Sequence, residues 1–281
     1  MKISEIITKL KSYYLGYDYD GNPIKDETSR DKLLYGSMNK ECTGIVITCW
    51  PSAKVIEEAG ELGANFIICH EAIFWNHGDQ QDWLKDNNIK TYISKVELLD
   101  KYDITVWRNH DYIHSGMPIG NNNYSDGIFY GLMKKLEIEK YLAADIKMPI
   151  YYEFPKVTVE KIGNYIVDKL SLNGAKIIGC PKTEVENAMI APHIIGNNNN
   201  EIMYIDKNNI DLIIALELID YTVSEYIFDS NALGKNKAII TIGHFNTEEP
   251  GMEYMLEYMP EVLDTHIPTY FVKSGDMYNY I

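Results

Sequence analysis

The feature that most constrains the fold is a repeated alternation between short runs of β-branched residues and segments with helical periodicity. From residue 44 onward, apolar runs recur, and several are followed by a stretch whose apolar residues are spaced three or four apart. Runs buried on both faces are typical of parallel strands, which are joined by crossover helices. The expected strands are residues 44–49, 65–69, 104–107, 176–179, 188–190, 212–215 and 238–242. The sequence therefore predicts an α/β fold.

Helical periodicity and turn residues predict how the chain is organised around these strands. The expected helices are residues 3–10, 51–62, 96–99, 127–136, 159–170, 223–233 and 251–259. The stretch 147–154, with Pro149 inside it and Pro155 after it, is typical of a hinge. The alternation resumes beyond it, so we expect an N-terminal α/β lobe over residues 1–145 and a C-terminal α/β lobe over residues 146–281. The asparagine-rich run 196–200 indicates a loop.

Charge and composition exclude several classes of function. The chain has 26 basic and 41 acidic residues, a net charge of −15, which is the wrong sign for a protein that neutralises nucleic acid phosphates. No apolar run is long enough to span a membrane, and the first residues lack the apolar core of a signal peptide. The four cysteines are far apart and are expected to be reduced. We therefore expect a cytoplasmic protein that binds neither nucleic acid nor membrane.

Most of the histidines follow predicted strands, at positions where α/β proteins bind ligands. Five of the seven histidines lie in three short segments, each of which follows a predicted strand. These segments contain His70, Glu71 and His77; His110 and His114; and His244 and Glu248. Ligands in open α/β sheets bind outside the carboxyl ends of the strands, so the three segments are expected to meet in space.

The residue types in these segments point to a transition metal. Imidazole and carboxylate together suit Zn, Mn, Fe or Ni better than Ca or Mg. Three imidazoles and two carboxylates, from His70, Glu71, His114, His244 and Glu248, exceed what one four-coordinate catalytic ion takes. Two ions bridged by a carboxylate and a water use all five ligands. The sequence thus predicts a dinuclear metal site.

Other interpretations of these residues stay open. A single histidine at a strand end is more often a hydrogen-bonded structural residue than a ligand, and a metal-free α/β protein is one alternative. His193 and His266 have no companion carboxylate and are expected to be structural or surface residues. Glu217, Asp220 and Glu225 follow another predicted strand and either line the same cleft or begin a helix. No phosphate loop, dinucleotide-binding motif or serine nucleophile motif is present in the sequence.

The three histidine segments carry a resemblance to a known family, the Nif-three-like dinuclear metal centre proteins, also called GTP cyclohydrolase I type 2 homologues. The segment from Thr43 to Glu71 resembles the family's strand–helix–strand, which ends in His-His-Pro, and residues 243–248 match its Gly-His-x-x-x-Glu motif in full. Two positions differ. Glu71 replaces the second His, and His114 replaces the Asp of a His-x-x-x-Asp motif, so the total of three imidazoles and two carboxylates is kept. The chain is similar to a divergent branch of the family.

The resemblance also implies an architecture and an activity. It implies two similar α/β lobes with mainly parallel mixed sheets facing a central cleft, a metal pair in that cleft, and a toroidal homohexamer. The expected activity is that of a metal-dependent hydrolase, acting through a metal-bound hydroxide on a small phosphorylated or nucleotide-like metabolite. His110 and His77 are the expected orienting residues or proton carriers. The alternative is a non-catalytic hexameric metal-binding scaffold or regulator.

Overall fold

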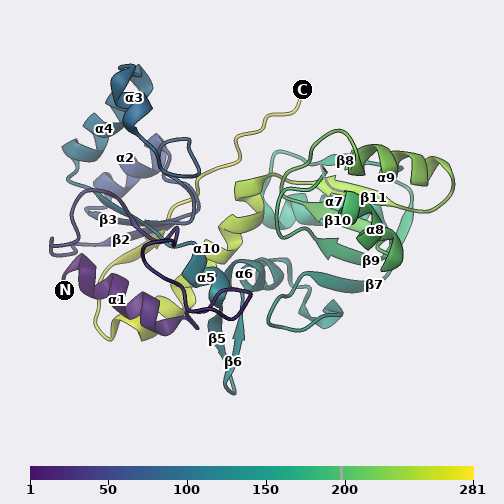
Figure 1. Cartoon of the computed structure of the whole chain (residues 1–281), viewed down its shortest axis with the longest axis horizontal. Coiled ribbons are helices and arrows are strands. Elements are labelled where there is room, and N and C mark those ends of the chain that lie inside the picture. Colours follow the sequence, from purple (N-terminus) through teal and green to yellow (C-terminus); the bar gives the residue numbers. More distant parts are fainter. Residues whose placement is uncertain (197–198) are drawn as a thin grey trace. The chain divides into compact units, whose positions relative to one another are not determined.

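The computed structural model describes residues 1–196 and 199–281, and it has a mixed α/β fold (Figure 1). Contacts divide the chain into two compact units. Unit 1 comprises Met1–Gly131 and Gly251–Ser274, and unit 2 comprises Leu132–Pro250 and Gly275–Ile281. The predicted α/β class is confirmed, with one mixed five-stranded sheet in each unit. The expected lobe boundary between residues 145 and 146 stays a prediction.

The sheet of unit 1 is built mainly from the buried strands that the sequence predicts. Its order is β1-β4-β3-β2-β12. The strands are β1 (Leu33–Tyr35), β2 (Ile45–Thr48), β3 (Phe66–Cys69), β4 (Thr105–Arg108) and β12 (Thr269–Phe271). Neighbouring strands from β4 to β12 are parallel, and only β1 is antiparallel to its neighbour. Every residue of β2, β3 and β4 is buried, which accounts for the apolar runs of β2 and β3, and β4 buries Thr105 and Arg108 as well.

Helices cover both faces of this sheet. On one side lie α2 (Ala53–Glu61), whose N-terminus is capped by Ser52, and α4 (Lys90–Lys101); α1 (Ile3–Tyr13) lies on the other side (Figure 1). Apolar residues of α2 and α4 pack on the sheet in one core cluster. The remaining elements of unit 1 are α3 (Asp82–Asp86), α5 (Asp111–Ser115), and the hairpin of β5 (Met117–Gly120) and β6 (Asn123–Ser125).

Unit 2 has its own sheet, with order β7-β9-β10-β11-β8. The strands are β7 (Tyr151–Thr158), β8 (Lys176–Ile178), β9 (Glu184–Ile190), β10 (Leu212–Ala215) and β11 (Ala238–Thr241). The three central strands are parallel, and β7 and β8 pair antiparallel at the two edges. The helical elements are η1 (Glu139–Tyr141), α7 (Val159–Leu170), α8 (Asn199–Lys207) and α9 (Val223–Ala232).

Three elements differ from the expected local structure, and two helices cross the boundary between the units. The boundary between the two units falls within α6 (Gly127–Leu136) and within α10 (His244–Leu263). The helix expected at 251–259 begins earlier, at His244, and residues 151–154 of the expected hinge at 147–154 belong to strand β7. Within the expected loop at 196–200, α8 already begins at Asn199, and residues 197 and 198 lie outside the described residues.

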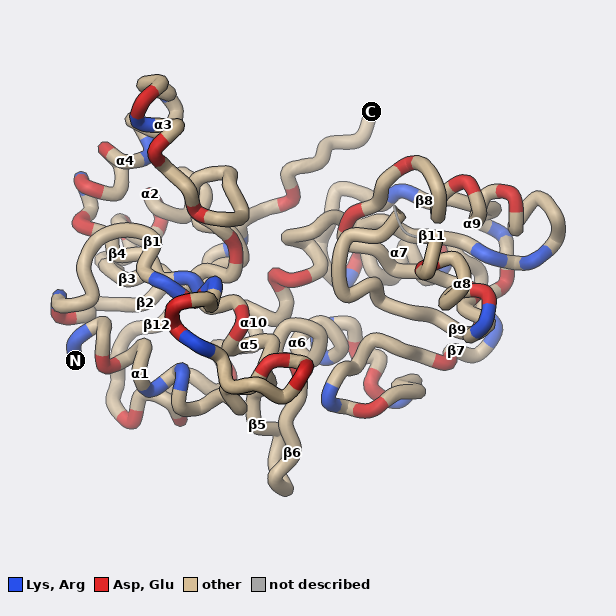
Figure 2. Tube along the Cα trace, in the orientation of Figure 1, with Lys and Arg blue, Asp and Glu red and all other residues tan. Residues whose placement is uncertain are grey.

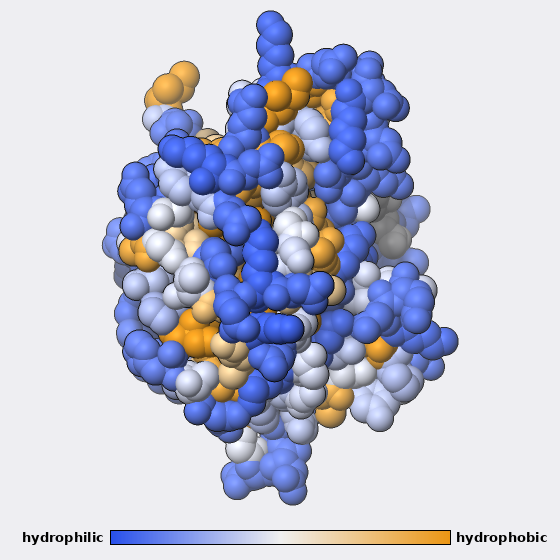
Figure 3. Space-filling view, turned by 90° about the vertical axis from the view of Figure 1, so that its left-hand side faces the viewer, coloured by the Kyte–Doolittle hydropathy of each residue, from blue (hydrophilic) through white to orange (hydrophobic). Residues whose placement is uncertain are grey.

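Charged residues of both signs are distributed along the chain. In Figure 2, acidic residues are interspersed with basic ones along the trace of the described residues. The face drawn in Figure 3 is mostly hydrophilic, with hydrophobic side chains in separate patches. Among the helices that the structure describes, none combines the length and the apolar character needed to cross a membrane.

Candidate metal centre

Three histidines of unit 1 come together at the carboxyl ends of two neighbouring parallel strands. His70 directly follows β3, His110 comes two residues after β4, and His114 lies on the short helix α5. The rings of His70 and His110 are stacked with centroids 4.4 Å apart, and that of His114 lies 5.0 and 5.1 Å from them. One nitrogen of each imidazole lies within 4.8 Å of a nitrogen of each other imidazole. This set is called the histidine group below.

Each member of the histidine group has its Nδ1 atom held by an oxygen. Nδ1 lies 3.0 Å from the Asn109 carbonyl in His70, 2.9 Å from Asp111 in His110, and 2.8 Å from Asp126 in His114. A neutral imidazole that donates from Nδ1 has its lone pair on Nε2, the tautomer a metal needs. The three side chains are therefore oriented for Nε2 coordination.

Burial keeps two of these imidazoles neutral. Burial, and then the neighbouring imidazoles of His110 and His114, holds the pKa of His70 well below its ordinary value. Burial likewise lowers the pKa of His110 to about 3. Metal ions bind the deprotonated form of histidine, so the donor set fits a transition metal without prior loss of a proton from these two residues.

A buried carboxylate fixes the segment that carries two of the three histidines. Asp31 accepts hydrogen bonds from the backbone N–H groups of His110, Asp111 and Tyr112, at 2.9, 2.7 and 3.3 Å. The hydroxyl of Ser29 also donates to it, at 2.8 Å. Burial raises the pKa of Asp31 to about 6. This carboxylate satisfies backbone donors at the start of α5 and so sets where His110 and His114 lie.

Glu71 lies between the histidine group and a buried arginine. Its Oε1 atom is 4.0 Å from Nε2 of His110, and its Oε2 atom accepts from Nη2 of Arg108 at 3.1 Å. Arg108 is fully buried and also donates to Asp79 at 3.1 Å and to the His70 carbonyl at 2.9 Å. Glu71 thus has one oxygen committed to an ion pair and one facing an imidazole.

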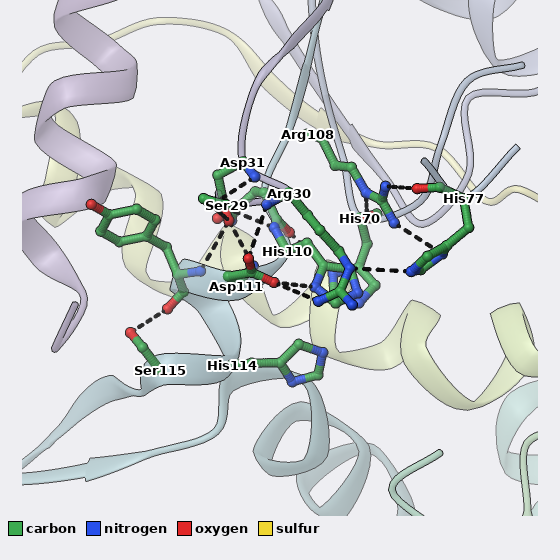
Figure 4. Close-up of polar contacts among 12 residues, drawn as sticks. Ser29, Arg30, Asp31, His70, His77, Arg108, His110, Asp111, His114 and Ser115 are labelled. Carbon is green, nitrogen blue, oxygen red and sulfur yellow. Dashed lines mark hydrogen bonds and ion pairs between the residues drawn. The ribbon is translucent and has the colours of Figure 1, made fainter. Parts of the chain in front are cut away.

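His77 lies at the exposed edge of this network. Its Nδ1 atom is 3.6 Å from Oε2 of Glu71, and its side chain is 55% exposed. Arg30 donates from Nε to Nε2 of His77 at 3.1 Å and from Nη1 to Asp111 at 3.0 Å. Figure 4 shows the Arg30 guanidinium reaching both partners. No local motif marks Arg30, Arg108 or Asp126, so these residues were not predicted as part of the site from the sequence.

The third histidine segment lies in unit 2, where His244 is flanked by two carboxylates. His244 is the first residue of α10, and its Nε2 atom is 3.2 Å from Oε1 of Glu248, one helical turn further along. Its Nδ1 atom is 3.3 Å from Oε1 of Glu217, in the segment after β10. Because α10 begins at His244, the spacing of His244 and Glu248 places both on one face of a helix. Glu217, for which two interpretations were open, contacts a predicted ligand.

The fold and these contacts define a class: an α/β protein with a histidine-rich candidate metal site at the carboxyl ends of parallel strands. The chain belongs to the Duf34/NIF3 (NGG1p interacting factor 3) family, whose model matches residues 1–276. The resemblance stated from the sequence is thereby confirmed.

Individual relatives agree with this assignment. A GTP cyclohydrolase 1 type 2 homolog of Clostridium perfringens is 25% identical over 278 residues, covering 95% of this chain and 94% of the relative. A hypothetical protein of Staphylococcus aureus superposes with a TM-score of 0.69 at 17% identity, covering 100% and 99% of the two chains. A Bacillus cereus protein related to NIF3 gives 0.69 at 14% identity with the same coverage. The two structures show the shared fold.

Proposed function

We propose that this protein is a metal-dependent hydrolase that holds two divalent cations, Zn, Fe, Mn or Ni, in one dinuclear site. The proposed ligands are His70, Glu71 and His114 of unit 1, with His244 and Glu248 of unit 2. The observation that carries the proposal lies in the histidine group: an oxygen holds the Nδ1 atoms of the two proposed ligands His70 and His114 and leaves their Nε2 atoms as the coordinating nitrogens. When bound, such ions act as Lewis acids and lower the pKa of a coordinated water toward neutrality.

The surrounding residues have separate tasks in this proposal. Arg108 neutralises Glu71 and holds its carboxylate in place. His110, stacked on His70 and hydrogen-bonded to Asp111, orients the ligand beside it or carries a proton. His77 is exposed and close to Glu71, so it exchanges protons with solvent or orients Glu71. Glu217, whose carboxylate lies 3.3 Å from the Nδ1 atom of His244, orients that imidazole.

The proposed substrate is a small phosphorylated or nucleotide-like metabolite. The printed name of the Clostridium perfringens relative refers to GTP cyclohydrolase. We do not extend ring opening of GTP to this chain, because its net charge of −15 disfavours a polyanion unless metals or local basic groups offset it. The toroidal hexamer and the cytoplasmic location stay predictions.

Metal content tests the ligand assignment. Purified protein is loaded with Zn, Mn, Fe or Ni, desalted, and analysed by elemental mass spectrometry. We expect two ions per chain in the wild type and loss of at least one in His114→Ala, His244→Ala and Glu248→Ala. The exposed His266→Ala is the matched control and should retain both ions. Equal metal content in all of these variants would contradict the proposed site.

Open coordination positions separate the hydrolase from the scaffold. Water-proton relaxation of Mn-loaded protein reports whether the bound ions keep exchangeable water, which catalysis by metal-bound water requires. The loaded protein is then screened against nucleotides and phosphoesters, with His70→Ala as the inactive control. Bound metal with no exchangeable water and no turnover would favour the non-catalytic scaffold.

A further inference from the structure

A second feature of unit 2 lies beside His244. A cavity of about 590 Å³ opens at the carboxyl ends of β10 and β11, where the segments 216–220 and 241–243 line it. This end of a parallel sheet is where α/β proteins bind ligands, and the volume is in the range of small-molecule sites. The cavity is called the tyrosine pocket below, because Tyr278 and Tyr280 line it.

The C-terminal segment that carries the two tyrosines contacts residues from other parts of unit 2. Asn173 donates from its backbone N–H to Asp276 at 2.9 Å and from its side-chain amide to the Tyr278 carbonyl at 2.7 Å. Asp276 also accepts from the side-chain amide of Asn246 at 3.2 Å. Gly174 lies close to the ring of Tyr280, because a Cβ atom there would be 2.8 Å from it. The segment that carries the two tyrosines is therefore anchored beside the pocket, and aromatic rings of this kind suit the face of a planar ring.

The charges at the pocket select against an anion. Glu217 and Asp220 line it with two carboxylates, and Lys176 is the one basic side chain among its described lining residues. A different cavity of unit 2, of about 510 Å³, contains Lys140, Lys156 and Lys161 with Tyr165. An anionic ligand would favour those lysines, whereas a ring bearing N–H donors would favour the carboxylates of the tyrosine pocket.

The pocket is adjacent to the proposed chemistry. Glu217, which lines the pocket, is the residue whose carboxylate lies 3.3 Å from Nδ1 of His244. A small cavity of about 80 Å³ that His244 itself lines shares Glu217, Gly243 and Tyr278 with the tyrosine pocket. A ring bound between the tyrosines would thus place the rest of its molecule next to His244.

We infer that the tyrosine pocket binds an uncharged or cationic heteroaromatic ring of the substrate, with Tyr278 and Tyr280 as stacking surfaces and Glu217 and Asp220 as hydrogen-bond acceptors. As a statement about substrate, the inference rests on the proposed function, and it narrows the substrate class to a molecule with a nucleobase-like ring. As a statement about binding, it depends only on the tyrosine pocket and its lining residues, and not on the metal site.

Binding of nucleosides to metal-free protein tests the inference. Adenosine and guanosine are the probes, their triphosphates are the anionic counterparts, and calorimetry or saturation-transfer NMR gives the affinity. We expect the nucleosides to bind more tightly than the triphosphates and Tyr280→Ala to weaken nucleoside binding by about tenfold, because base stacking on an aromatic side chain is lost. Tyr280→Phe should keep the affinity, because it retains the aromatic ring and removes only the hydroxyl group.

Tyr165→Ala is the matched control, since it removes a tyrosine of the same unit at the lysine-containing cavity. Nucleoside affinity that falls in Tyr165→Ala and not in Tyr280→Ala would overturn the inference, as would tighter binding of the triphosphates. The two proposals fail separately. If nucleoside binding depends on Tyr280 but the protein takes up no metal, the hydrolase proposal is refuted and the tyrosine pocket stands. If the protein binds two ions per chain but no nucleoside, the tyrosine pocket is refuted and the metal site stands.

Discussion

The Nδ1 atom of His114 lies 2.8 Å from Oδ2 of Asp126, a carboxylate that is 1% exposed. The other oxygen of Asp126 accepts from the backbone N–H groups of Ile128 and Phe129, at 2.9 and 3.1 Å, at the start of α6. One carboxylate thus ties a proposed metal ligand to a helix end. In metal sites this arrangement fixes the imidazole tautomer and raises its basicity.

We expect Asp126→Asn to weaken metal binding by about 10- to 100-fold while the protein stays folded. The single amide oxygen can accept from the backbone N–H groups at the start of α6, which leaves the NH2 group, a donor, facing Nδ1 of His114 in place of an acceptor. Competition with a chromophoric chelator measures the affinity. Tyr19→Phe, which removes the 2.9 Å hydrogen bond from Tyr19 to the same carboxylate, is the control and should bind metal normally. Unchanged affinity in Asp126→Asn would contradict the role of Asp126 in supporting His114 as a ligand.

Arg108→Met should be strongly destabilising. The substitution leaves Glu71 and Asp79, whose side chains are 10% and 4% exposed, without the buried cation that pairs with both. Removing one partner of a buried ion pair costs about 3–5 kcal/mol. Urea unfolding monitored by circular dichroism measures the loss. The double variant Arg108→Met/Glu71→Gln should recover part of it, because one of the stranded charges is gone.

The comparison variant for Arg108 is Arg30→Met, which breaks an ion pair of a 47% exposed side chain. Exposed pairs contribute about 1 kcal/mol or less. An equal effect of the two substitutions would mean that the buried pair does not contribute as proposed.

We expect Lys95 to increase the free energy of unfolding as the pH rises into the alkaline range. Its ammonium is buried, donates to the Ile73 carbonyl at 2.6 Å, and lies 5.1 Å from the ring centre of Trp50. Burial lowers the pKa of Lys95 from 10.5 to about 8. Between these values the folded state binds fewer protons than the unfolded chain, so the contribution of Lys95 to the free energy of unfolding increases with pH, by at most about 3 kcal/mol.

The measurement is the free energy of unfolding from pH 8 to pH 10.5 in wild type, Lys95→Met and Lys90→Met. Lys90 is an exposed residue of the same helix. The slope attributed to Lys95 should disappear only in Lys95→Met. Identical pH profiles in the three proteins would refute the assignment.

Two helical glycines should respond in opposite directions to alanine. A Cβ atom at Gly251 of α10 would lie 2.4 Å from the Cα atom of Ile128, whereas one at Gly163 of α7 would meet its nearest neighbour, Ile240, at 3.8 Å. We expect Gly251→Ala to cost about 1–3 kcal/mol from overpacking. Gly163→Ala should stabilise by up to about 1 kcal/mol, because alanine loses less backbone entropy in a helix. Chemical unfolding of both variants tests the pair, and a stabilising Gly251→Ala would contradict the close helix packing.

The sequence predicted those elements whose signal is local. Strands β3 and β10 are short β-branched runs buried on both faces, and their expected positions agree with the structure to within a residue. Pro149 and Pro155 favoured a hinge at 147–154, but residues 151–154 of that stretch form the first half of strand β7. It is an edge strand whose register shifts between Glu153 and Val157, and proline is tolerated at such a position.

In the candidate site, too, the residues with a local sequence signal were predictable and the others were not. His70 and His110 were predictable because each follows one of two adjacent parallel strands. Arg108 and Asp126 were not, because their importance comes from contacts with side chains 37 and 12 positions away in the chain. Residue types and strand ends therefore indicate which side chains can bind metal, and only the folded structure shows which groups orient them.

The position of β12 has a consequence for synthesis. This strand pairs with β2 at the edge of the unit 1 sheet, although the two are more than two hundred residues apart in the chain. At about 5–20 residues per second, the ribosome would deliver β12 roughly 10–45 s after β2. During that interval the nascent unit has an unpaired apolar strand edge, the kind of surface that promotes aggregation. The sheet of unit 1 is thus complete only after β12 has been synthesised.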